Sequence, residues 1–315
     1  MSWAGIVDAI EGQAEDLRHL DNLILNFDAL IDIYQTLPNQ EIQAQVASRM
    51  LKAIIYRQPQ HPDLEKWSER ALLPPSDSLT INITAHILLL QMIHYLLHTS
   101  DIKKAEKTLI EARQLLDFPF ETPFLRLVAK VMAAYFYMIT GKHIRCRQAV
   151  TEGLELARES GIKLYNGALS MYFISDLLNV NKIKTAQKYI QEMNSSVGFF
   201  NSFDKICYYF QKARMALITG ELRKAAINVE TTLDLTKKLG MPVSTSDCYI
   251  LHALVLYASK RHVEAESQLV KARRMIRHYH LTFSKLHLLL TQVHFAGGAP
   301  GHACPALLLD RYLGL

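Results

Sequence analysis

The sequence predicts an all-α protein, a right-handed superhelical solenoid of antiparallel helix pairs with a period of about 40 residues. Two observations predict it. The phrase LITGELRKAAINVETTLDLTKKLG at 217–240 shares seven identical positions with MITGKHIRCRQAVTEGLELARESG, which begins 79 residues earlier at Met138. In addition, no segment has the alternating apolar pattern and turn dipeptide of a β-hairpin. Such a period indicates stacked supersecondary units that bury one continuous core.

A small residue near the start of the second helix of each unit fixes the register, and we call it the anchor. The anchors lie 41, 40, 39 and 40 residues apart and are Ala105, Cys146, Ala186, Ala225 and Ala265. The residue four after each anchor is always apolar, which places both on one stripe of a helix. Five before the anchor, three of the units carry Gly or Asn, which suit the turn between two helices.

Each unit therefore consists of a helix A, a tight turn and a helix B. The A helices are expected at 80–97, 122–140, 165–179, 203–219 and 245–258. The B helices are expected at 102–117, 144–160, 182–195, 222–239 and 263–278. Helix pairs of this kind bury their apolar faces only when they are stacked.

The two ends depart from this register. Residues 1–78 form an N-terminal helical segment, with a helix to about Tyr34, a second over 41–56 and a short one to about Leu72, before Pro74, Pro75 and Ser76. Residues 79–280 form the five helix pairs. Residues 281–315 form an incomplete sixth unit, whose A helix FSKLHLLLTQVHFA is followed by an irregular Gly- and Pro-rich tail.

Composition excludes several classes of protein. Apolar residues make up 50% and charged residues 21%, which is typical of a folded chain. The net charge of +5 gives no basis for direct nucleic-acid binding. The longest apolar run, Ile87 to Leu97, is too short to span a membrane. The four cysteines form no CxxC pair and no secretory signal is present, so we expect a cytoplasmic protein with free thiols.

The sequence gives little support for a metal site or for a catalytic nucleophile. His94 and His98 share a helix face, but the Glu of an HExxH motif and a third ligand are missing. Cys207 is the candidate nucleophile of a cryptic hydrolase, yet core packing explains it better. We therefore expect no metal, no cofactor and no enzymatic activity.

A polar stripe on the A helices is the best functional signal. Positions 14, 11 and 7 before each anchor share one face that the packing positions do not use. Its polar and aromatic members are Gln91, His94, His98, Tyr135, Tyr172, Ser175, Asn179, Gln211 and Arg214. Aromatic and Arg side chains are the usual anchors of recognition, so we expect this stripe to bind a ligand in a concave groove.

These features resemble the tetratricopeptide consensus. The turn Gly, the Ala anchor, the aliphatic residue four later and the small residue seven later all match it. Unit ends such as LELARESG and LDLTKKLG look like the MalT-type variant, and LKAIIYRQPQHPDLEKWSERAL at 51–72 is similar to a stretch of large bacterial signal-transduction ATPases, many of them transcriptional activators. The resemblance implies a sensor arm that binds a protein, a peptide or a small-molecule effector.

The chain departs from that family in two respects. It contains no GxxxxGK[ST] motif and no recognisable helix-turn-helix. An ATPase or DNA-binding module would have to lie in missing flanking sequence or in a partner chain. Two alternatives to the groove-binding scaffold remain, a structural adaptor that docks through its uncapped C-terminal unit and the cryptic hydrolase.

Overall fold

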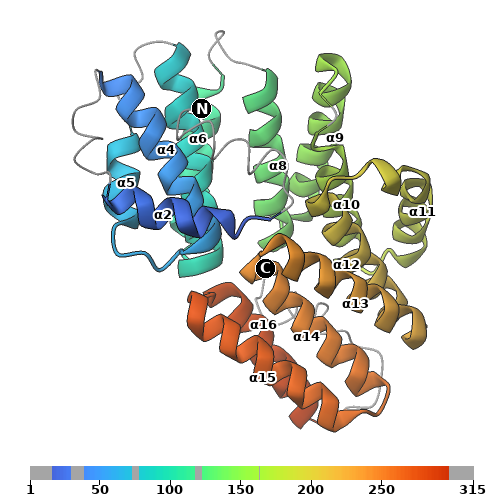
Figure 1. Cartoon of the computed structure of the whole chain (residues 1–315). Coiled ribbons are helices and arrows are strands. Elements are labelled where there is room, and N and C mark those ends of the chain that lie inside the picture. Colours follow the sequence, from blue (N-terminus) through green and yellow to red (C-terminus); the bar gives the residue numbers. More distant parts are fainter. Residues whose placement is uncertain (1–15, 30–38, 73–77, 118–122, 163, 298–315) are drawn as a thin grey trace. The chain divides into compact units, whose positions relative to one another are not determined.

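The computed structural model describes residues 16–29, 39–72, 78–117, 123–162 and 164–297. In these ranges the regular structure is entirely helical, with fourteen α-helices, one π-helical turn and one 3-10 turn. The expected all-α class is therefore confirmed (Figure 1). The tail at 298–315 and the turn at Pro74–Ser76 lie outside the described residues.

The chain divides into two units by its internal packing. Unit 1 comprises Met1–Met132 with Leu239–Met241, and unit 2 comprises Ala133–Lys238 with Pro242–Leu315. The division falls within helix α8 (Pro123–Ile139). The segment boundaries expected from the sequence, at residues 78 and 280, stay a prediction.

Among its described residues, unit 1 opens with three helices out of the repeat register. They are α2 (His19–Ala29), α4 (Gln40–Arg57) and α5 (Leu64–Ala71). Helix α4 begins where the side chain of Asn39 accepts the N–H of Ile42 at 2.8 Å, an N-cap that satisfies one otherwise unpaired donor. Trp67, Met50 and Ile54 are fully buried and form the centre of this packing. The helix that the sequence predicts to about Tyr34 is described only as far as Ala29.

The first repeat helix, α6 (Ser78–His94), is a core helix. It continues as a π-helical turn over Tyr95–Thr99 and packs against α7 (Ile102–Leu115) and α4. The stretch Ile81–Thr99 is long and apolar enough to cross a membrane by length and composition alone, but 61% of it is buried inside the fold. Burial of this extent explains its apolar composition.

Unit 2 continues the helix pairs beyond α8. The helices are α9 (His143–Ser160), α10 (Asn166–Asn179), α11 (Ile183–Met193), α12 (Ser202–Ile218), α13 (Leu222–Leu239), α14 (Pro242–Ala258), α15 (His262–Tyr279) and α16 (Thr282–Ala296). Each expected A and B helix is present, with its ends within a few residues of the predicted ones. Successive A helices pack on one another, α10 on α12, α12 on α14 and α14 on α16.

The five anchor residues are all fully buried, with an exposed fraction of 0%. The apolar residues four positions later are buried too. A side chain no larger than that of Ala or Cys lets helix B approach helix A closely, so the two apolar stripes come into contact. The register read from the sequence is therefore the packing register of the repeats.

The turns between A and B helices share one backbone geometry. The residue five before each anchor has a left-handed φ in all five units, and these residues are Ser100 (55°), Gly141 (68°), Asn181 (57°), Gly220 (78°) and Lys260 (62°). In the last four helix pairs, the N–H of the residue after the left-handed one donates to the carbonyl of the residue five positions before the donor, at 2.8 or 2.9 Å. This is the hydrogen bond of a Schellman motif, which ends helix A and redirects the chain.

The turn of the first helix pair has a slightly different hydrogen bond. There the N–H of Asp101 donates to the carbonyl of Tyr95, six residues earlier, at 2.9 Å. The π-helical turn at Tyr95–Thr99 supplies the extra residue. The same left-handed turn is thus reached from a helix that carries one additional residue.

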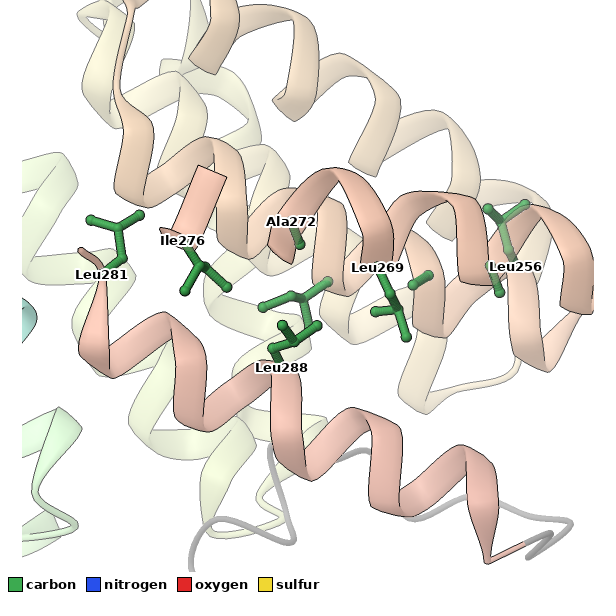
Figure 2. Close-up of a cluster of buried hydrophobic side chains, with 9 residues drawn as sticks. Leu256, Leu269, Ala272, Ile276, Leu281 and Leu288 are labelled. Atoms are coloured by element: carbon green, nitrogen blue, oxygen red, sulfur yellow. The ribbon is translucent and has the colours of Figure 1, made fainter. Parts of the chain in front are cut away.

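The last helices show how the stack continues. Leu256 of α14, Leu269 and Ile276 of α15, and Leu288 of α16 belong to one buried cluster. Figure 2 shows these side chains converging between the helices. Helix α16 therefore packs against both α14 and α15. The sixth repeat expected from the sequence stays a prediction. Tyr257 stacks on Phe295 with ring centroids 4.0 Å apart, which adds a second contact between α14 and α16.

The left-handed turn gives a stability prediction. Lys260 has φ 62°, which costs a residue with a β-carbon about 1 kcal/mol relative to Gly. We expect Lys260→Gly to stabilise unit 2 by about 1 kcal/mol, and Gly220→Ala to destabilise it by a similar amount. Urea unfolding of both variants measures this. If both substitutions changed the stability in the same direction, the shared turn geometry would be contradicted.

Candidate functional site

Four residues of the predicted stripe form one hydrogen-bonded cluster, which we call the Arg214 network. They are Ser175 and Asn179 of α10 and Gln211 and Arg214 of α12. Nη1 of Arg214 donates to Oγ of Ser175 at 2.8 Å and to Oε1 of Gln211 at 2.9 Å. Nη2 donates to Oδ1 of Asn179 at 2.8 Å. Arg214 is only 7% exposed, so a charged group joins two A helices from inside the packing.

The repeat explains why these residues meet. Ser175 and Arg214 occupy the same position in successive units, eleven before their anchors. Helices α10 and α12 pack side by side, so equal positions become neighbours. The planar guanidinium can donate in several directions at once, which suits three acceptors spread over two helices.

Two tyrosines of the stripe form an aromatic pair. The rings of Tyr135 on α8 and Tyr172 on α10 lie with centroids 5.3 Å apart and tilted by 39°. Burial raises the pKa of Tyr135, and the nearby carboxylate of Asp247 adds to this increase. The phenol of Tyr135 therefore stays protonated at neutral pH and is not available as a base.

The three stripe residues that lie in unit 1 contact other residues of unit 1. The amide of Gln91 donates to Oγ of Ser68. The rings of His94 and His98 lie 5.6 Å apart, and His98 also hydrogen-bonds with the backbone of Ile55. Burial lowers the pKa of His98 to about 3, with His94 contributing, so this imidazole is neutral at physiological pH. In the described ranges, three metal-ligating side chains do not converge at any point.

The structure thus brings together Ser175, Asn179, Gln211 and Arg214. It also pairs Tyr135 with Tyr172 and His94 with His98. Whether these nine residues line one ligand groove stays a prediction. Burial of Arg214, Gln211 and Ser175 shows that part of the stripe holds adjacent repeats together.

Sequence reasoning missed a buried carboxylate on α10. Asp176 is fully buried, and Nδ1 of His143 lies 2.7 Å from its Oδ1, while Nη1 of Arg147 lies 3.8 Å from its Oδ2. Burial raises the pKa of Asp176, and the contact with His143 opposes that increase. The available signal was an acid among apolar residues in SDLLN, next to the stripe. The contact fixes the start of α9 against α10.

Three cysteines lie among the described residues, Cys146, Cys207 and Cys248, and they have the properties of core residues. Burial raises the pKa of Cys146 to about 12, and burial also raises the pKa values of Cys207 and Cys248. A thiol nucleophile must ionise, and apolar burial opposes ionisation. The geometry around Cys207 therefore gives no support to the hydrolase alternative.

Comparison with known proteins supports the fold class. No protein-family model matches the chain, and no curated protein matches its sequence. A Rap protein solved in complex with competence and sporulation factor has a TM-score of 0.69 at 8% identity, over 99% of this chain and 86% of that chain. NprR solved with its cognate peptide NprX has a TM-score of 0.64 at 13% identity, over 97% of this chain and 89% of that chain.

At these identities the likeness concerns the fold alone. Both neighbours are tetratricopeptide-like helical repeat proteins, so the expected tetratricopeptide-like architecture is confirmed. The narrower likeness to MalT receives no support from the comparisons.

The Arg214 network gives a prediction for stability. Arg214→Ala leaves three acceptors without their donor, and we expect it to destabilise unit 2 by about 3 kcal/mol. Arg214→Lys keeps the charge but loses the planar fork, so we expect about half that effect. Thermal and urea unfolding measure both. The matched control Arg223→Ala, on the exposed side of α13, should change stability by less than about 0.5 kcal/mol. If Arg214→Ala left the stability unchanged, the result would contradict the network.

Proposed function

We propose that the chain is a non-catalytic tetratricopeptide-like scaffold that binds a peptide or an extended protein segment on the face of its A helices. The Arg214 network carries this proposal, because it places amide, hydroxyl and guanidinium groups of two successive units at one point. An extended segment presents backbone donors and acceptors at regular spacing. Side-chain amides can donate and accept together, so they match such a backbone.

The solved neighbours support this reading. NprR was solved with its cognate peptide NprX, and the Rap protein with competence and sporulation factor. Their fold covers nearly all of this chain. We accordingly propose a sensor role for the chain in a bacterial, cytoplasmic regulator, with a peptide, a protein or a small-molecule effector as ligand. Nucleotide-driven or DNA-binding output would come from flanking sequence or from a partner.

The proposed mechanism is a change in the stacking angle of the repeats. In a helical repeat each unit contacts mainly its neighbours, so small rotations at one junction accumulate along the stack. A ligand that replaces Ser175, Gln211 or Asn179 as an acceptor of Arg214 would alter the junction between α10 and α12. Binding and repeat geometry would then be linked through the same side chains.

Gln211 and Gln148 offer a matched test of this proposal. The full chain would be screened against a synthetic library of linear hexapeptides by affinity selection and mass spectrometry. We expect Gln211→Ala, within the network, to weaken the best binder at least about tenfold. Gln148→Ala, whose amide reaches only Glu152 on the outer surface of α9, should bind as the original chain does. Absence of any binder, or equal loss in both variants, would contradict the proposal.

A structural adaptor is the second candidate, and one observation favours it. Val293 of α16 is 60% exposed, although the matching position of the five complete units is buried. Those residues are Ile93, Ala134, Ile174, Ala213 and Ala253. An adaptor that docks through α16 should lose partner capture from a cell lysate on Val293→Asp and keep it on Gln211→Ala. The reverse pattern in a pull-down would reject the adaptor.

A further inference from the structure

Asp204 makes an unusual contact between the starts of two A helices. It lies in the first turn of α12, is only 5% exposed, and its carboxylate accepts the backbone N–H of Ala168 at the start of α10. The first N–H groups of a helix lack partners within the helix, and their dipoles favour a negative charge. A carboxylate from α12 therefore caps α10 from outside that helix.

Gly167 makes room for this contact. A β-carbon built onto Gly167 would lie 2.7 Å from Oδ1 of Asp204 and closer still to the other two carboxyl atoms. Gly inside a helix is unfavourable by about 1 kcal/mol relative to Ala. Its presence here is explained by the buried carboxylate that occupies the space of its missing side chain.

The same two helices are joined again further along. Arg214 lies ten residues after Asp204 on α12, and Ser175 lies eight residues after Gly167 on α10. At 1.5 Å per residue, the two contacts are about 12 to 15 Å apart along the helices. The start of α10 meets the start of α12, and the later part of α10 meets the later part of α12, so the helices run parallel. Two contacts at this spacing fix both the separation and the tilt of the pair.

We infer that Asp204 is a positioning residue for the Arg214 network: its carboxylate holds the start of α10 against α12 and sets the geometry in which Arg214 meets Ser175 and Asn179. The inference rests on the proposed function and deepens it. The residues that Asp204 positions are the ones proposed to bind the ligand. Asp204 would act through these residues without touching the ligand.

The charge of Asp204 makes this contact sensitive to pH. Burial raises its pKa to about 6, while the N–H of Ala168 acts in the opposite direction. The charge of Asp204 acts on Cys207 of α12, and Lys205 and Tyr208 lie within one turn of Asp204 on the same helix. The helices packed against α12 carry further titratable side chains, among them Tyr172 and Asp176 of α10, Tyr189 of α11 and Asp247 of α14. Below pH 6 the carboxyl is protonated and becomes a weaker acceptor for the helix start.

Stability does not explain why this acid is buried. Because the pKa is higher in the folded chain than the ordinary 3.8, the folded state binds the proton more tightly than the unfolded state. On this group alone, stability therefore decreases as the pH rises from about 4 to about 6 and stays lower above that. The ionised form is kept at neutral pH at a cost in stability, which agrees with a positioning role.

Hydrogen exchange at the Ala168 amide tests the inference without any ligand. In the full chain, NMR exchange rates corrected for intrinsic chemistry should show about fivefold less protection at pH 5 than at pH 7.5, with a midpoint near 6. Asp204→Asn should show no such step. Asp234→Asn, an equal charge change on the exposed side of α13, should retain it. A pH-independent amide in the original chain, or a step that persists in Asp204→Asn, would overturn the inference.

A double-mutant cycle tests the link to the network. The coupling between Arg214 and Asn179, expressed as a ratio of unfolding constants, should be at least about threefold smaller in an Asp204→Ala background. Gly167→Ala should have the same effect, whereas Gly198→Ala, where a β-carbon meets no atom within 4 Å, should not. Unchanged coupling in Asp204→Ala would reject the positioning role. The peptide screen is a separate experiment, so a chain that binds no peptide still gives a result here.

Discussion

The approach of helix B to helix A at one small residue per unit is the constraint on which the fold depends. Ala or Cys at the anchor is fully buried in all five units. A larger side chain there would separate the two apolar stripes of the pair. The left-handed turn five residues earlier serves the same contact, because it places helix B over the face of helix A that carries the small residues.

The sequence predicts the fold well because this constraint is periodic. Ala, Cys, Gly and Asn are the residues that small spaces and left-handed turns favour, and their spacing is visible in a single chain. Ser100 and Lys260 are less informative, since neither residue type indicates a left-handed backbone. The regular hydrogen bond of the turn and the surrounding register hold these two residues in that geometry.

The candidate site is less predictable, and the reason is physical. The repeat register identifies which residues share a face, so Ser175, Gln211 and Arg214 could be selected from the sequence. Register alone does not determine whether a long side chain turns outward or bonds to the neighbouring helix. Arg214 does the second, because three neutral acceptors lie within reach of its guanidinium. Asp176 and Asp204 were missed because their partners, His143 and the Ala168 amide, belong to other helices.

Helix α10 is the element where these buried polar contacts concentrate. Asp176 connects it to α9, Asp204 caps its start from α12, and Ser175 and Asn179 receive Arg214. Buried charges seldom stabilise a fold more than apolar residues of similar size would, since desolvation offsets most of the attraction. They do restrict geometry, because each requires a partner at a defined distance and direction. The charged contacts fix α10 relative to α9 and α12, and a fixed register of polar groups is what recognition of an extended backbone requires.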